Sequence, residues 1–182
     1  GLRNITAIPN YFLNQCSSLT ELDLSGWGNI NTIGECFLNG CSSLEELNIS
    51  AWTQVTAIPN NFLSGCASLL KLHIKGWESI ETIGKDFLSG CTALSTLEIQ
   101  NWTGVSEISD NFLKGCESLE NFDLSGWTGV QTIGSYFLSG CEKIANLNLS
   151  DLTVIKNIND LSLFKTKNVI NMEMMFLGCC NL

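Results

Sequence analysis

The segment GCASLLKLHIKGWESIETIGKDFLSGC, residues 65–91, begins and ends with the same motif. Phe62-Leu63 stands just before its first Gly-Cys and Phe87-Leu88 just before its last, 25 residues later. The unit C-x-x-L-x-x-L-x-[LI]-x-x-W-x-x-[VI]-x-x-I-x-x-x-F-L-x-G recurs along the chain. Its first position is held by Cys16, Cys41, Cys66, Cys91, Cys116 and Cys141. Since so short a unit has too few apolar side chains to close a core, the units must stack.

Each unit contains L-x-[LI], whose period of two predicts a short strand, as at Leu47 and Ile49. Equivalent strands of successive coils then pair in parallel, about 4.8 Å apart, in one continuous sheet. The F-L-x-G-C motif predicts a helical turn or irregular bend that a left-handed glycine ends. These glycines are Gly40, Gly65, Gly90, Gly115 and Gly140. The sequence therefore predicts an α/β solenoid with one parallel sheet of short strands, 25-residue coils and little regular helix.

The repeat predicts a single domain over residues 1–182 with about seven coils. Residues 1–158 follow the regular pattern, whereas residues 159–182 form a shortened, irregular repeat that ends in a copy of the F-L-x-G-C motif at Phe176. Both ends of the chain fall inside a unit and lack the polar cap that a terminal coil needs. We therefore expect the chain to be an excerpt of a longer array.

Composition excludes several classes of protein. Apolar residues make up 45% of the 182 residues and charged residues 15%, which indicates a folded protein. The net charge is -9 with only nine Lys and Arg, so we expect no nucleic acid partner. No apolar run approaches the roughly 20 residues that cross a bilayer, and the first residues do not resemble a signal peptide.

With these positions laid out, a family resemblance can be stated. The segment CSSLEELNISAWTQVTAIPNNFLSG, residues 41–65, resembles the BspA-like class of leucine-rich repeats, and the tail NVINMEMMFLGCCNL, residues 168–182, resembles a variant of it. The resemblance implies a leucine-rich-repeat arc. It also implies a surface or secreted protein that binds host or partner molecules.

The repeated cysteine and tryptophan positions each allow more than one interpretation. The chain has one histidine and no C-x-x-C pair, so we expect no metal site and a row of reduced, buried thiols. Cys36 lies out of register and is the candidate for an exposed thiol. The tryptophans are either core or an exposed aromatic strip for carbohydrate; because Leu152 fills the same position, core is favoured. They are Trp27, Trp52, Trp77, Trp102 and Trp127.

The outward side of the predicted sheet carries the side chains that vary between units. The candidate partner-binding residues on it are Glu21, Asp23, Glu46, Asn48, Lys71, His73, Lys75, Glu98 and Asp123. Two acidic strands thus meet one basic strand, which is followed by acid again. The charges either neutralise one another across strands or fix the register of a protein partner, and both interpretations stay open.

Nothing in the sequence indicates catalysis. His73 is the only histidine, no nucleophile is placed beside a base by any motif, and we expect no catalytic residue and no cofactor. The sequence therefore predicts a non-catalytic protein-protein recognition or adhesion module at the cell surface or secreted. The alternative is an intracellular or structural scaffold, which reduced cysteines and unglycosylated N-x-[ST] sequons at Asn4, Asn48, Asn101 and Asn148 would favour. A carbohydrate-binding module is a third possibility.

Overall fold

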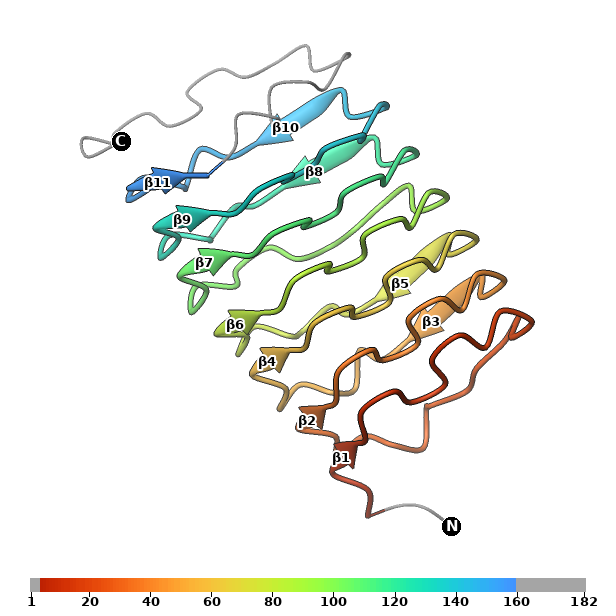
Figure 1. The fold of residues 1–182 in the computed structure, drawn as a ribbon. Coiled ribbons are helices and arrows are strands. Elements are labelled where there is room, and N and C mark those ends of the chain that lie inside the picture. Colours follow the sequence, from red (N-terminus) through yellow and green to blue (C-terminus); the bar gives the residue numbers. More distant parts are fainter. Residues whose placement is uncertain (1–3, 160–182) are drawn as a thin grey trace.

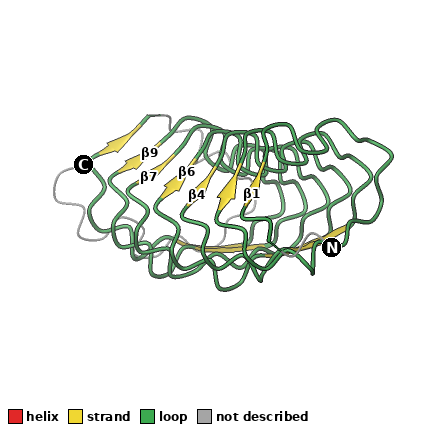
Figure 2. Ribbon diagram, turned by 90° about the horizontal axis from the view of Figure 1, so that it is seen from below, coloured by secondary structure: helices red, strands yellow, loops and turns green. Residues whose placement is uncertain are grey.

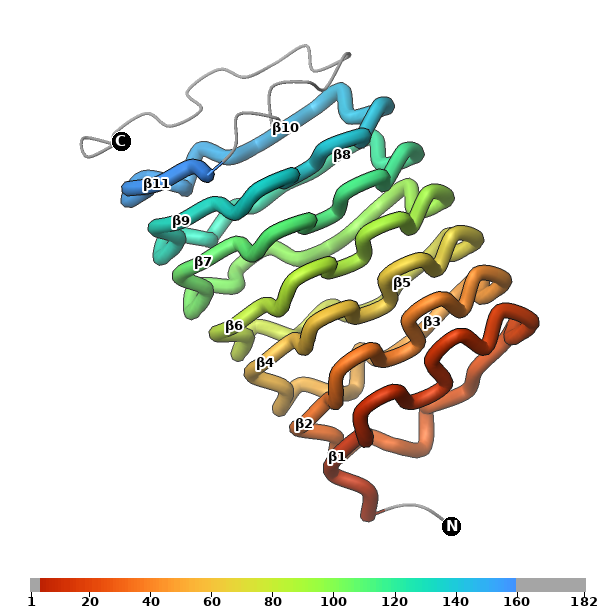
Figure 3. Tube along the Cα trace, in the orientation of Figure 1, coloured from red at the N-terminus to blue at the C-terminus, as the bar shows by residue number. Residues whose placement is uncertain are grey.

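A computed structural model describes residues 4–159 of the chain, which wind into a solenoid of about six turns (Figures 1 and 3). Successive coils lie side by side along one axis. We number coils 1 to 6 from the units that begin at Cys16, Cys41, Cys66, Cys91, Cys116 and Cys141. The described residues contain strands and turns but no helix, so the predicted bend is irregular. Apart from Asn159, the predicted shortened repeat lies outside the described residues.

The predicted L-x-[LI] strands form one row of parallel pairs with a register of 25 residues. Coils 2 and 3 pair through β3 (Glu46–Asn48) and β5 (Lys71–His73), and coils 5 and 6 through β8 (Asn121–Asp123) and β10 (Asn146–Asn148). Residues 21–23 and 96–98 occupy the same position in coils 1 and 4 but form no strand. The sheet is therefore discontinuous along the axis.

A second row of two-residue strands lies at the repeated isoleucine, on the opposite side of the solenoid (Figure 2). The sequence reading did not anticipate this row. Its members are β1 (Ala7–Ile8), β2 (Thr32–Ile33), β4 (Ala57–Ile58), β6 (Thr82–Ile83), β7 (Glu107–Ile108), β9 (Thr132–Ile133) and β11 (Asn157–Ile158). In each the isoleucine points inward and its neighbour points out. The two rows enclose the core between them.

The F-L-x-G bend joins the coils through a third line of hydrogen bonds. The Leu63 amide donates to the Phe37 carbonyl of the coil before at 2.9 Å, and the Gly65 amide donates to the Ser89 carbonyl of the coil after at 2.7 Å. This two-way bonding needs a backbone that alternates in handedness, with φ of 55° at Leu63 and 74° at Gly65. The left-handed conformation predicted for the glycines is confirmed, and the preceding leucines share it.

Cys36 occupies the first left-handed position of this bend, with φ of 57°, where the next coil has Asn61. Asparagine tolerates this conformation better than cysteine does. We therefore expect Cys36→Asn to raise the free energy of unfolding by about 0.5–1 kcal/mol, measured by urea denaturation. Cys36→Ala removes the same thiol but keeps the unfavourable backbone, so it is the matched control. Equal stability of the two variants would contradict the prediction.

The core consists of stacked aromatic rows, as predicted for the tryptophans. Four of the five indoles are buried, and Trp27 in coil 1 is partly buried against them. Ring centroids of Trp102 and Trp127 lie 5.4 Å apart, and those of Phe37 and Phe62 also lie 5.4 Å apart. Within the described residues the indoles thus form no exposed strip for carbohydrate.

Consecutive coils are not equivalent, because the residue after the repeated isoleucine alternates. Coils 1, 3 and 5 place glycine there, at Gly34, Gly84 and Gly134. The preceding coils place Pro9, Pro59 and Ser109 there. Next to Pro59, the Asn60 carboxamide oxygen accepts a hydrogen bond from the Lys85 amide at 2.8 Å. The same contact recurs two coils further on, where the Asp110 carboxylate accepts from the Ser135 amide at 2.9 Å. The structural unit therefore comprises two coils, or 50 residues.

Candidate functional site

The candidate site lies on the exposed side chains of the L-x-[LI] row, which we call the outer strand face: residues 21–25, 46–50, 71–75, 96–100, 121–125 and 146–150. Alternation along each strand buries the Leu or Ile side chains and turns their neighbours outward. Eight of the nine predicted site residues are exposed, and Asp123 is half-buried. The structure therefore brings all nine together on one face.

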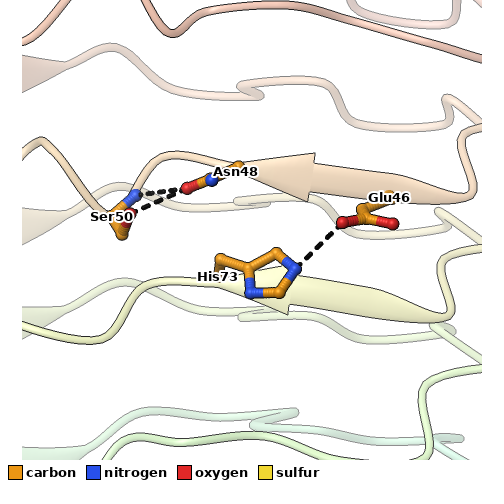
Figure 4. Close-up of polar contacts among 4 residues, drawn as sticks. All are labelled: Glu46, Asn48, Ser50 and His73. Atoms are coloured by element: carbon orange, nitrogen blue, oxygen red, sulfur yellow. Dashed lines mark hydrogen bonds and ion pairs between the residues drawn. The ribbon is translucent and has the colours of Figure 1, made fainter.

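Several polar side chains on this face close local turns. The Asn48 carboxamide oxygen accepts hydrogen bonds from the Ser50 amide at 3.2 Å and the Ser50 hydroxyl at 2.8 Å (Figure 4). Asp23 makes the same turn with Ser25, whose hydrogen bonds hold the pKa of that carboxyl below its ordinary value. Asp23 cannot carry an N-linked glycan, yet it forms the same turn as Asn48. The turn is therefore sufficient to explain the N-x-S sequence at Asn48 without glycosylation.

The charged side chains of coils 2 and 3 do not pair with the residues directly opposite them on the neighbouring strand. Glu46 and Lys71 are directly opposite in register. The Glu46 carboxylate instead contacts the His73 imidazole, with 3.0 Å between Oε1 and Nε2 (Figure 4). Among the residues that the structure describes, the Lys71 ammonium has no hydrogen bond or ion pair. Lys75 lies 4.0 Å from Glu98, at the limit of an ion pair, and both side chains are largely exposed.

The far end of the face is different, because its polar groups bond to each other. The Asn146 side chain donates to the Asn121 carboxamide oxygen at 2.7 Å, and the Asn148 side chain donates to the Asp123 carboxylate at 2.8 Å. These contacts use the groups that a partner would otherwise bind. Over coils 5 and 6, the polar side chains of the outer strand face therefore hydrogen-bond to each other. Over coils 1 to 3 the face is charged, and some of its side chains have no side-chain partner among the described residues.

Two open grooves cover the charged end of the face. One, of about 660 Å³, is lined by Thr20, Glu21, Leu22, Asp23, Glu45, Glu46, Asn48, Leu70 and Lys71. The other, of about 570 Å³, is lined by Asn48, Ser50, Lys71, Leu72, His73, Ile74, Lys75, Thr96 and Glu98. They share Asn48 and Lys71 and therefore adjoin, and we call the two grooves together the depression.

Leu70 and Glu45 are groove residues that were not predicted from the sequence, and Leu70 is the unusual one. Its side chain is 49% exposed although it is large and apolar. The equivalent positions in the other coils hold Thr20, Glu45, Ser95, Glu120 and Ala145. A leucine among these small or polar residues was the available signal.

The repeated cysteines are free and lie in the core. Cys91 is fully buried, and its thiol donates to the carbonyl of Leu63, 28 residues earlier, at 3.2 Å. Burial raises the pKa of the Cys66 thiol to about 12, and the pKa of Cys91 is raised well above its ordinary value for the same reason. The inert core thiols that were predicted are thus free and buried in coils 2 to 6. Cys36, predicted to be exposed, is half-buried, and so is Cys16.

These environments predict selective alkylation of the folded protein. Brief treatment with iodoacetamide at about pH 8 should label Cys16 and Cys36 and spare Cys41, Cys66, Cys91, Cys116 and Cys141, because the buried thiols are not accessible to the reagent. Peptide mass spectrometry gives the site of each label. Treatment in denaturant is the control and should label all nine cysteines of the chain. Rapid labelling of Cys91 in the folded protein would contradict the prediction.

The described residues hold no cluster of three or more His, Cys, Asp or Glu side chains that could bind a metal ion. His73 has a carboxylate as its side-chain partner and lies in an open groove. An ion pair outside the face joins the Lys85 ammonium to the Asp110 carboxylate at 2.9 Å, which lowers the pKa of Asp110 together with the Ser135 amide. No long apolar helix of the kind that crosses a membrane occurs among the described residues.

Stacked parallel coils with repeated Leu, Ile and Phe cores define a leucine-rich repeat protein. The sequence pattern of the BspA type leucine rich repeat region matches six copies, over residues 2–70 and 56–177, and the chain belongs to this family. Leucine-rich repeat proteins generally serve as protein-interaction modules. A comparison with curated proteins finds no match.

Solved structures share the fold. The leucine-rich repeat protein TpLRR of T. pallidum is 20% identical, with a TM-score of 0.69 over 85% of this chain and 67% of that one. A leucine-rich repeat protein from Bacteroides ovatus is 22% identical, with a TM-score of 0.61 over 98% of this chain. The chain spans about half, 51%, of the Bacteroides protein. At these identities the likeness describes the fold alone.

Proposed function

We propose that this chain is a non-catalytic recognition or adhesion module that binds a protein partner through the charged end of the outer strand face. The observation that supports this function is the Lys71 ammonium. It stands opposite Glu46 in register, yet it has no partner among the described residues because His73 contacts that carboxylate. A lysine whose only role was to neutralise its neighbour would pair with it. An unpaired charge on an open groove is suited to setting the specificity and association rate of a partner.

The test is a selection of binders from a phage-displayed library of protein fragments. Binders selected on the parent chain are then measured against Lys71→Glu. We expect most to lose about tenfold or more in affinity, because the substitution reverses a charge at the centre of the groove. Lys143→Glu makes the same change of charge on coil 6, outside both large grooves, and is the matched control. Binders that tolerate Lys71→Glu as well as Lys143→Glu would contradict a role for this face.

A structural spacer is the second candidate, and the bonding of the coils favours it. The amide contacts of coils 5 and 6 and the bend hydrogen bonds tie each coil to its neighbours throughout the described residues. Such a stack holds attached segments at a fixed separation whether or not a face binds anything. The spacer function predicts that no surface of the chain is preferred by the selected binders.

A further inference from the structure

We infer that the partner presents a short extended segment along the solenoid axis, with a cationic side chain over coils 1 and 2, followed over coil 3 by an apolar side chain and a carboxylate. This inference rests on the proposed function and adds the chemistry of the partner. It follows from which charges of the face are already used and which remain available.

The acidic end of the depression lies over coils 1 and 2. Asp23 is used by its turn with Ser25, and Glu46 is used by His73. Glu21 and Glu45 are exposed, line the larger groove and have no side-chain partner among the described residues. The available charge at this end is therefore a pair of carboxylates, which suits a Lys or Arg side chain of the partner.

The basic end lies over coil 3. Within residues 4–159, Lys71 has no side-chain partner and lines both grooves, while Lys75 has only its 4.0 Å contact with Glu98. Two ammonium groups on one coil suit a carboxylate of the partner. Leu70 lies on coil 3 beside Lys71 and lines the groove that also holds the free acids, so it supplies an apolar contact at the basic end.

The length of the depression along the solenoid axis fits a short extended segment. Coils 1 and 3 are two strand spacings apart, about 10 Å, which equals about three residues of extended chain.

The probes for the test are two dye-labelled synthetic peptides of identical composition. One has two lysines, a leucine and two glutamates in that order, flanked by neutral residues; the other alternates lysine and glutamate around the same leucine. Fluorescence anisotropy at about 20 mM salt, where charge interactions are weakly screened, measures binding to the parent chain. We expect the segregated peptide to bind about tenfold more tightly than its alternating isomer. Equal affinity for the two peptides would overturn the inference.

Variants of the chain then show which end of the peptide lies over coil 3. Lys71→Glu with Lys75→Glu should weaken the segregated peptide at least tenfold, and Leu70→Ser should weaken it severalfold. Lys143→Glu with Lys156→Glu makes the same change of net charge away from the charged end and should leave affinity unchanged. An unchanged affinity in the Lys71 and Lys75 variant would overturn the inference. Library binders that map to the face but ignore peptide order would do so too, while leaving the proposed function standing.

Discussion

Replacing Trp77 with alanine is expected to lower the free energy of unfolding by about 3–5 kcal/mol, since a large buried aromatic is lost and its cavity remains. The indole is fully buried, its N–H donates to the Ile49 carbonyl at 3.1 Å, and its ring stacks on Trp52 with 6.4 Å between centroids. It also makes an edge contact with Phe62 at 6.0 Å. The substitution removes contacts to the neighbouring coil, on which a stacked array depends for cohesion.

Trp77→Leu is the matched variant, because Leu152 occupies the same position in coil 6 and is fully buried there. We expect it to cost less than the alanine variant, because leucine fills part of the cavity. Guanidinium denaturation followed by circular dichroism measures both without using tryptophan fluorescence. A loss below about 1 kcal/mol for Trp77→Ala would show that the indole row is not a tightly packed core.

Replacing Gly84 with alanine is expected to destabilise the protein by about 3 kcal/mol although it adds one methyl group. The new Cβ would lie 2.4 Å from the Asn60 backbone nitrogen and 2.5 Å from the Pro59 carbonyl carbon. These are backbone atoms of the neighbouring coil, and they cannot rotate away. The Gly84 amide also donates to the Ile58 carbonyl at 2.8 Å, so moving the coils apart would weaken that bond.

Gly28→Ala is the control for this prediction, since a Cβ there would have no atom within 4 Å. Alanine at an unstrained glycine restricts the unfolded chain, so we expect no loss and a gain of up to about 1 kcal/mol. Thermal and urea denaturation of both variants compare the two glycines directly. Equal effects of the two substitutions would mean that the close approach of coils at Gly84 has no energetic weight.

The repeat predicted most of the fold because one rule applies to every coil. A 25-residue period with apolar side chains at fixed positions has few solutions, and stacking in register buries all of them. The burial of the tryptophans and the left-handed glycines followed from this period. The strands at the repeated isoleucine did not, because a two-residue strand has too little alternation to be recognised.

The candidate face was predicted less completely. Alternation within L-x-[LI] placed Glu46, Asn48, Lys71 and His73 outward, and the structure agrees. Which of these groups remains free depends on side-chain geometry, since Glu46 reaches diagonally to His73 instead of pairing with Lys71. Opposite and diagonal neighbours on adjacent strands are both within reach of a long side chain, so the sequence alone cannot choose between them.

The sequence by itself therefore determined the solenoid, its 25-residue coil and its aromatic core, because identical side chains at identical spacing must form rows when the chain winds. The tertiary structure decided what depends on distances between coils. It set the close backbone approach at Gly84, the pairing of coils into 50-residue units and the unpaired lysine on the outer strand face. These features arise from contacts between atoms of different coils, although the alternation of Gly84 with Pro59 at the same position marks the 50-residue unit in the sequence as well.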